Sequence, residues 1–110
     1  MKGAYVLEGK TPRRAKTRRE WQAFMSDKRQ LQLAWTDLGD VGYVSTVFIG
    51  RDTGEVPGLP VLFESMARIG PDYSDAVERR YPTWEAALLG HAELVAEHHR
   101  LVLLAKLSAA

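Results

Sequence analysis

Two carboxylates within residues 43–66 are the first side chains of this sequence that could do chemistry. Residues 52–54 read Asp-Thr-Gly, as in aspartic proteases, whose chemistry needs two such aspartates sharing one proton across a dimer axis. Arg51 precedes Asp52, and burying its charge would be costly. Because aspartate and glycine are preferred turn residues, we interpret Asp52 as part of a tight turn. A hydrolase that uses Asp52 and Glu64 is the least favoured function.

Glu64 lies between Phe63 and Ser65, in a segment that is otherwise apolar on both faces. An isolated charge in such a segment must be paired, solvated or shifted in its pKa. We expect Glu64 to face solvent beside an arginine, for which Arg51 and Arg68 are the candidates. The alternative places Glu64 in a binding pocket or an interface.

The three histidines lack the spacing of a metal site. His91 and His98 are seven residues apart, or about 10.5 Å along a helix, whereas paired helical ligands usually lie four residues apart. We expect core or interface histidines, and a metal ion shared across an oligomer axis is the alternative. Ser45 and Thr46 lack the elbow of a serine nucleophile, and no phosphate-binding loop or dinucleotide fingerprint is present. The sequence therefore predicts no catalytic residue, metal or cofactor.

Positive charge is concentrated in residues 13–19, which read RRAKTRR. The five basic side chains are Arg13, Arg14, Lys16, Arg18 and Arg19. Contacts between such a run and phosphates would give a salt-dependent, sequence-tolerant affinity, and the neighbouring Trp21 could stack on a base. A nucleic acid or a free nucleotide is therefore one expected ligand. The alternative is a solvated face or an ion-paired patch between subunits.

The charge of the whole chain is nearly balanced but unevenly distributed. Residues 1–30 hold nine basic and three acidic side chains, a net charge of +6, and the remaining 80 residues hold six basic and eleven acidic ones, a net charge of −5. Such asymmetry indicates an electrostatic surface at one end of the molecule. Its partner could be nucleic acid, or the acidic remainder of the same or a neighbouring subunit.

The 110 residues suffice for one domain, residues 1–110, with a core of its own. There is no cysteine, which excludes disulfides, thiolate zinc sites and a cysteine nucleophile. No apolar stretch approaches the roughly 18 residues of a membrane span, and the N-terminal pattern is not that of a signal peptide. We therefore expect a cytoplasmic protein without a membrane partner.

Apolar alternation predicts a small sheet. Residues 4–9 favour a short strand, and residues 31–35, 43–50 and 59–69 favour three strands that short connections would join as an antiparallel meander. Residues 70–75 begin a polar connection that could include a turn of helix.

The basic segment favours a short helix. Thr11 could cap it, with Pro12 in the first helical position, and at least residues 17–26 should be helical. Residues 12–19 could instead form an ordered turn or a loose arm.

Residues 82–107 read as one long amphipathic helix with Thr83 as its N-cap. Its apolar stripe is formed by positions 84, 88, 91, 95, 98, 102 and 105. About 25 helical residues span roughly 37 Å, whereas strands of about six residues span nearer 20 Å, so the helix should overhang the sheet. The overhanging end is apolar all round, which predicts a homo-oligomer. The expected interface residues are Leu101, Val102, Leu104 and Leu107.

Four segments of the block from Trp35 to Val95 read AWTDLGD, VSTVFIGRD, LPVLFESM and RRYPTWEAALLGHAELV, and the block covers rather more than half of the chain. In these segments the block resembles a family of small bacteriophage and prophage proteins without an assigned activity. The family pattern resembles VSTVFLGLDH, a Gly- and Pro-rich connection, PLLFETM, and RYSTWEEAxxGH. Thr53 stands where the family often has histidine, which weakens an Asp-His pair, and Ala86 replaces a glutamate of the capping box. The resemblance implies a phage or prophage origin and a host-cell cytoplasmic location, but no activity.

Together these features predict an α+β fold: a small antiparallel meander of three to four strands, a long C-terminal helix packed across it and a short basic N-terminal helix. The expected core residues are Trp21, Phe24, Leu33, Trp35, Val44, Phe48, Val61, Phe63, Trp84, Leu88 and Val95. The leading function is a non-enzymatic phage accessory protein that binds a host or phage protein as a small oligomer. The alternative is a protein that binds or sequesters nucleic acid or nucleotides through residues 12–19.

Overall fold

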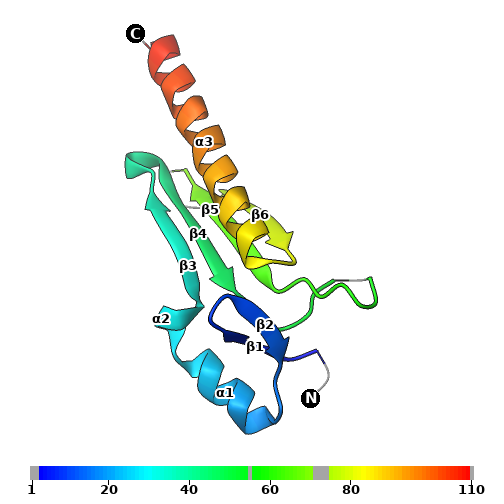
Figure 1. Ribbon diagram of the computed structural model, residues 1–110. Coiled ribbons are helices and arrows are strands. Elements are labelled where there is room, and N and C mark those ends of the chain that lie inside the picture. The colour runs from blue at the N-terminus through cyan, green and yellow to red at the C-terminus, as the bar shows by residue number, and fades with distance from the viewer. Residues whose placement is uncertain (1–2, 55, 71–74, 110) are drawn as a thin grey trace.

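A four-stranded antiparallel sheet with one long helix across it forms the body of the molecule (Figure 1). The computed structural model describes residues 3–54, 56–70 and 75–109. The strands lie in chain order as β3 (Gln32–Asp37), β4 (Gly42–Phe48), β5 (Phe63–Ile69) and β6 (Asp75–Tyr81). A short 3₁₀ helix, η1 (Gly39–Val41), connects β3 to β4. The predicted α+β class and the meander are confirmed.

Strand β6 is a part of the main sheet that the sequence does not predict. Sequence patterning predicts a polar connection in this region, of which residues 71–74 lie outside the described part of the chain. The structure has a seven-residue strand that pairs with β5 over its whole length. Its polar sequence, DAVERRY, reflects its position at the edge of the sheet, where one face is solvated and the other is only partly covered.

Alternating burial along the two central strands builds the core. In β4, Val44, Thr46 and Phe48 are buried and the residues between them are half-buried. Each of these three residues lies opposite a buried residue of β5, and Val44 faces Ala67 while Phe48 faces Phe63. One face of the sheet is therefore closed, as expected for a sheet covered by a helix on one side.

Helix α3 (Trp84–Ala109) supplies that cover. Thr83 caps its first turn, because its Oγ1 accepts a hydrogen bond of 3.1 Å from the backbone N–H of Ala86, as predicted. Its sheet-facing buried residues are Ala87, His91, Leu94 and His98. Leu88, placed in the core by the sequence analysis, is instead 39% exposed, because the stripe continues through Ala87 and not through position 88.

The C-terminal turns of α3 project beyond the sheet (Figure 1). The molecule measures 57 × 27 × 23 Å along its principal axes, and the projecting helix contributes to the long axis. The predicted overhang is confirmed, and the oligomer inferred from it stays a prediction.

Trp35 is the clearest error in the predicted core. It is 56% exposed and stacks on Tyr43, with ring centroids 4.3 Å apart, on the face of the sheet that α3 does not cover. The pairing of β3 with β4 shifts between Gln32 and Ala34, which marks a bulge at Leu33. A bulge interrupts the alternation of side chains, so Leu33 packs with the core cluster while Trp35 points away.

An N-terminal hairpin and two short helices form the opposite end of the molecule. They are β1 (Tyr5–Glu8), β2 (Thr11–Arg14), α1 (Arg18–Ser26) and α2 (Lys28–Leu31). Thr11 therefore begins a strand, and the prediction that it caps a helix is wrong. Thr17 is the N-cap, and its side chain accepts a hydrogen bond of 3.0 Å from the backbone N–H of Glu20. The predicted helix over residues 17–26 is confirmed to within one residue.

Most other predicted core residues are buried or half-buried. Fully buried residues that the sequence analysis leaves out include Ala4, Val6, Leu62 and Ala87. Ala4 and Val6 pack with Ala15 against α1 and join the hairpin to the rest of the structure.

Candidate functional site

The end of the molecule formed by β1, β2 and α1 carries an excess of positive charge. Among contacts of the described residues, Arg13 is the one member of the basic run that is ion-paired: it contacts Glu8, and it makes a two-pronged bond to Glu20 at 2.8 and 2.9 Å. The Arg13 guanidinium, together with the backbone N–H of Lys16, lowers the pKa of Glu20 to about 2. Both nearby glutamates are therefore committed to a guanidinium that braces the hairpin against α1.

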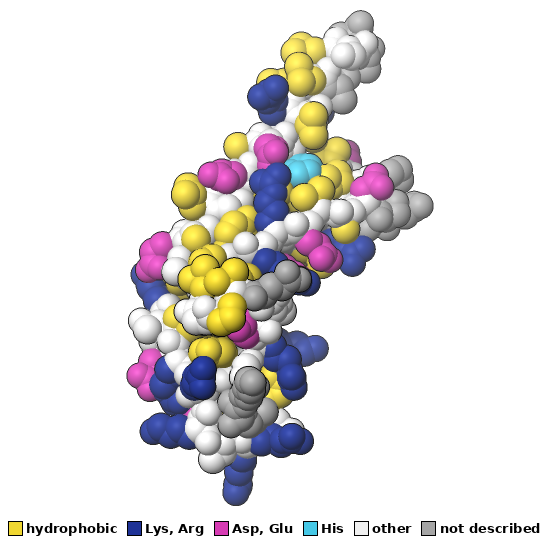
Figure 2. Space-filling view, turned by 90° about the vertical axis from the view of Figure 1, so that its right-hand side faces the viewer, with side chains coloured by type: hydrophobic (Ala, Val, Ile, Leu, Met, Phe, Trp, Pro, Cys, Tyr) yellow, Lys and Arg dark blue, Asp and Glu magenta, His cyan; other side chains and the backbone are white. Residues whose placement is uncertain are grey.

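The other four basic side chains of the run remain exposed. They are Arg14, Lys16, Arg18 and Arg19, and none of them lies within 4.0 Å of a carboxylate in residues 3–54, 56–70 or 75–109. We call these four residues the cationic end. Figure 2 shows lysine and arginine side chains gathered around this lower end of the molecule. The acidic remainder of the same chain does not neutralise it, over the part of the chain described.

Trp21 is less available than the sequence suggests. Its indole N–H donates a hydrogen bond of 3.0 Å to the carbonyl oxygen of Gly50, and the guanidinium of Arg51 lies 4.7 Å from the ring centroid. The ring is half-buried and fixes α1 to the end of β4. We therefore assign Trp21 to the scaffold of the cationic end and not to its binding surface.

Glu64 has a structural partner that the sequence analysis does not name. Its carboxylate accepts a hydrogen bond of 3.0 Å from Arg80, and its side chain is 16% exposed. Neither Arg51 nor Arg68 contacts it, so both candidate partners are wrong. The reason is the missed strand: Arg80 lies directly opposite Glu64 in the pairing of β5 with β6. Glu64 thus belongs to a cross-strand ion pair on the open face of the sheet.

Asp52 behaves as a turn residue. Its Oδ1 accepts hydrogen bonds from the backbone N–H groups of Gly54, at 2.9 Å, and Val61, at 3.0 Å. These two bonds lower the pKa of the carboxyl and keep it ionised. The residue is exposed, whereas the shared proton of an aspartic protease requires a buried pair. The geometry thus agrees with a tight turn.

His91 occupies the centre of a buried polar chain beneath α3. Its Nε2 lies 2.8 Å from Thr36 Oγ1 and its Nδ1 lies 2.7 Å from Thr46 Oγ1, which lies 2.6 Å from Ser65 Oγ. Burial lowers the pKa of His91 and favours the neutral ring. Thr46 and Ser65 are fully buried, so their end of this hydroxyl–imidazole chain is closed to a substrate. It is a structural network, as expected for a core histidine.

The second histidine of the helical stripe also has a partner within the chain. His98 is buried, and its Nδ1 lies 2.7 Å from the carbonyl oxygen of Leu94. Within the described residues, no group of three or more metal-ligating side chains comes together.

The overhang of α3 exposes leucines on several sides. Leu101, Leu103, Leu104 and Leu107 are 59, 59, 50 and 66% exposed, while Val102 is half-buried beside a hollow of about 190 Å³. That hollow is lined by Val41, Ile69, His98, Leu101 and Val102. Of the four predicted interface residues, Val102 thus faces the sheet of its own chain, Leu101 borders the hollow while largely exposed, and Leu104 and Leu107 face solvent.

Comparisons with family models, with curated proteins and with solved structures found no match. The resemblance to phage proteins therefore stays a prediction. No helix in the described part of the chain is long and apolar enough to span a membrane.

Proposed function

We propose that this chain is a non-enzymatic binding protein that holds nucleic-acid phosphates at its cationic end. The observation that carries the proposal is the absence of any carboxylate partner for Arg14, Lys16, Arg18 and Arg19 among the described residues. A fixed scaffold that presents unpaired cations favours a polyanionic ligand, because phosphate contacts release condensed counterions. Nucleic-acid binding thereby becomes the leading proposal, ahead of the protein-binding accessory function that the sequence favours first. The phage or prophage origin stays part of the proposal.

The salt dependence of binding follows from the size of the site. Four phosphate contacts give a slope of log affinity against log salt of about −2.8 for a single strand and −3.6 for a duplex. Raising the salt concentration from about 50 to about 200 mM should therefore weaken binding roughly 50-fold for a single strand and 150-fold for a duplex. Fluorescence anisotropy with labelled oligonucleotides of both kinds measures this slope.

The matched variants separate position from net charge. Arg18→Glu/Arg19→Glu should abolish binding at about 50 mM salt without destabilising α1, because acidic residues suit the first turn of a helix. Arg68→Glu/Lys106→Glu changes the net charge by the same amount away from the cationic end and should bind nearly as well as the wild type. Equal losses in the two double variants, or no binding by the wild type at that salt, would contradict the proposal.

A free nucleotide is an alternative ligand with the same phosphate chemistry. Mass spectrometry of small molecules released when the purified protein is denatured tests it directly. A released nucleotide together with weak oligonucleotide binding would replace nucleic acid by nucleotide as the ligand.

A protein partner is the second candidate, and a different observation favours it. On the open face of the sheet the exposed Trp35 stacks on the half-buried Tyr43, and a hollow of about 400 Å³ between α2 and the end of β4 is lined by Met25, Leu31 and Val47, among others. Exposed aromatic residues and apolar hollows are both typical of protein interfaces. A host protein captured by the wild type and lost by Trp35→Ser would support this candidate.

Self-association completes the proposal. The exposed leucines of the overhang form an apolar surface larger than scattered surface residues would give. We expect a small homo-oligomer, which light scattering at high micromolar protein concentration measures. A clean monomer under those conditions would exclude it.

A further inference from the structure

The outward side of α3, opposite the sheet, is unusually apolar. Six residues repeat along it at alternating steps of four and three: Leu89, Glu93, Ala96, Arg100, Leu103 and Leu107. At 100° per residue they lie within about 40° of one line, on the side away from Ala87, Leu94 and His98. We call these six residues the outer stripe. The helix of a monomeric protein normally carries polar residues on this side.

The steps of the outer stripe are those of a helix-pairing seam. A mean step of 3.5 residues keeps one stripe facing a partner helix, as the a and d positions of coiled coils do. Leu89, Leu103 and Leu107 are 63, 59 and 66% exposed, so the described part of the chain leaves the seam uncovered. The overhang of α3 extends the same seam beyond the sheet (Figure 1).

The two charges of the outer stripe determine which way a second copy would lie. Glu93 and Arg100 lie three and four residues from Ala96, on opposite sides of it. In a parallel pair each would face its own copy, Glu93 against Glu93 and Arg100 against Arg100. In an antiparallel pair centred on Ala96, each Glu93 faces Arg100 of the second copy, which gives two ion pairs related by a two-fold axis.

Apolar residues and the small central residue fit the same antiparallel register. Leu89 and Leu103 each lie seven residues from Ala96, so Leu89 of one copy meets Leu103 of the other at both ends of the contact. Ala96 at the centre allows the two helix backbones to approach closely. Leu107 then reaches the first turns of the second helix, which covers the overhang.

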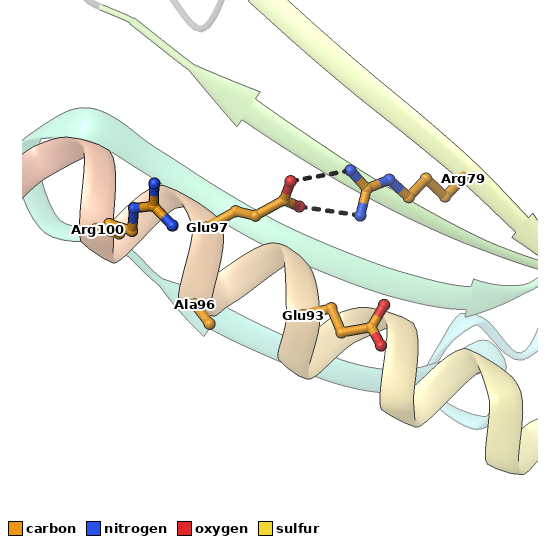
Figure 3. Close-up of a pocket in the computed structure, with 5 residues that line it drawn as sticks. All are labelled: Arg79, Glu93, Ala96, Glu97 and Arg100. Carbon is orange, nitrogen blue, oxygen red and sulfur yellow. Dashed lines mark hydrogen bonds and ion pairs between the residues drawn. The ribbon is translucent and has the colours of Figure 1, made fainter.

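Contacts within the chain leave both seam charges available. Arg79 of β6 binds Glu97 through two hydrogen-bonded contacts of 2.9 and 3.3 Å (Figure 3). Glu93 and Arg100 flank this pair, and in the described residues neither lies within 4.0 Å of an oppositely charged side chain. Beside them is an open hollow of about 410 Å³ lined by Arg79, Glu93, Ala96, Glu97 and Arg100, which has room for side chains of a second copy.

We propose that α3 pairs antiparallel with α3 of a second copy through the outer stripe, with Ala96 at the two-fold axis. The inference rests on the self-association proposed above and supplies its surface and its direction. The two sheets lie on the far sides of the helix pair, and the two cationic ends point in opposite directions. Nucleic-acid binding by either cationic end does not depend on the pairing.

Charge reversal tests the direction of pairing. In sedimentation equilibrium, Glu93→Arg and Arg100→Glu should each weaken the dimer roughly tenfold or more, because two attractive pairs become repulsive. Glu93→Arg/Arg100→Glu restores both pairs and should restore the dimer. Lys106→Glu is the control, because Lys106 lies on α3 but off the outer stripe, and it should leave the dimer unchanged. Circular dichroism confirms that each variant is folded.

Cross-linking tests the register, and the absence of native cysteine makes single cysteines clean probes. Under mild oxidation a mixture of Leu89→Cys and Leu103→Cys chains should form a disulfide-linked heterodimer. Leu89→Cys alone should not cross-link, because its two copies would lie about 21 Å apart along the axis and a disulfide needs Cα atoms within about 7 Å.

Three results would overturn the proposal. A wild-type monomer at high micromolar concentration rejects the pairing altogether. Efficient cross-linking of Leu89→Cys alone shows a parallel pair, and failure of the double reversal to restore the dimer shows that these charges do not meet. Oligonucleotide binding by a monomeric variant would still support the proposed function, so the two ideas fail separately.

Discussion

The buried chain from Thr36 through His91 and Thr46 to Ser65 offers the sharpest test of what holds α3 on the sheet. Thr46→Val replaces the central hydroxyl by a methyl group of nearly the same volume. The change removes the partner of His91 Nδ1, at 2.7 Å, and the partner of Ser65 Oγ, at 2.6 Å, and neither Thr46 nor Ser65 has exposed surface. The expected result is a loss of stability without a change of shape.

The magnitude follows from the number of polar groups left without a partner. Each buried polar group that loses its hydrogen bond costs about 1–3 kcal/mol, so two groups predict a loss of about 2–6 kcal/mol in the free energy of unfolding. Thr36→Val is the matched control, because it removes one hydrogen bond to His91 at a half-buried position that water can reach. It should cost about 1 kcal/mol.

Urea unfolding followed by tryptophan fluorescence measures both variants. With a slope of about 1–3 kcal/mol per molar urea, Thr46→Val should lower the midpoint by on the order of 2 M, and clearly more than Thr36→Val does. A Thr46→Val protein within about 0.5 kcal/mol of the wild type, or no less stable than Thr36→Val, would refute the assignment of this network as structural.

Three further predictions concern the same scaffold. The pKa of His91 is lowered by burial below its usual 6.5, so the neutral ring stabilises the fold fully above about pH 6.5; unfolding experiments should show this contribution falling as the pH drops through the folded-state pKa, and His91→Asn should remove that part of the pH dependence. Gly90→Ala should lower the melting temperature and cost about 1–3 kcal/mol despite its better helix propensity, because the added Cβ would overlap the ring of Tyr81; Tyr81→Leu in the same chain should recover part of the loss. Thr17→Ala should cost about 1 kcal/mol by removing the N-cap of α1, whereas Thr11→Ala, at an exposed strand position, should be nearly neutral in the same urea titration.

Most of the architecture can be predicted from local sequence patterns. Alternation over residues 43–50 and a helical stripe from residue 84 onward are strong because β4 is buried on alternate residues and α3 lies along a sheet. The sequence alone does not place the helix N-cap at Thr17, because Thr11 offers the same hydroxyl and is followed by a proline, which suits a first helical position. Pairing of Thr11 with Glu8 across the hairpin decides between the two threonines, and a local pattern does not contain that contact.

The candidate site likewise has features that the sequence shows and features that only the fold shows. The excess of cations in residues 13–19 is a matter of composition and is visible at once. Composition does not show which of these cations lack an ion pair, because Arg13 contacts Glu8 and Glu20 only when the hairpin folds against α1. The ion pair of Glu64 also depends on the fold. Its partner Arg80 lies on β6, whose polar sequence does not indicate a strand.

By itself the sequence determined the α+β class, the long overhanging helix, the cationic segment and the lack of cysteine chemistry, because these follow from composition and from periods of two and 3.6 residues. Only the tertiary structure decided that Trp35 faces outward and that Arg14, Lys16, Arg18 and Arg19 are left without ion-pair partners in the described chain. The physical reason is that a bulge and cross-strand contacts join residues far apart in the chain. The sequence periods of two and 3.6 residues report only which nearby residues of one helix or strand share a face.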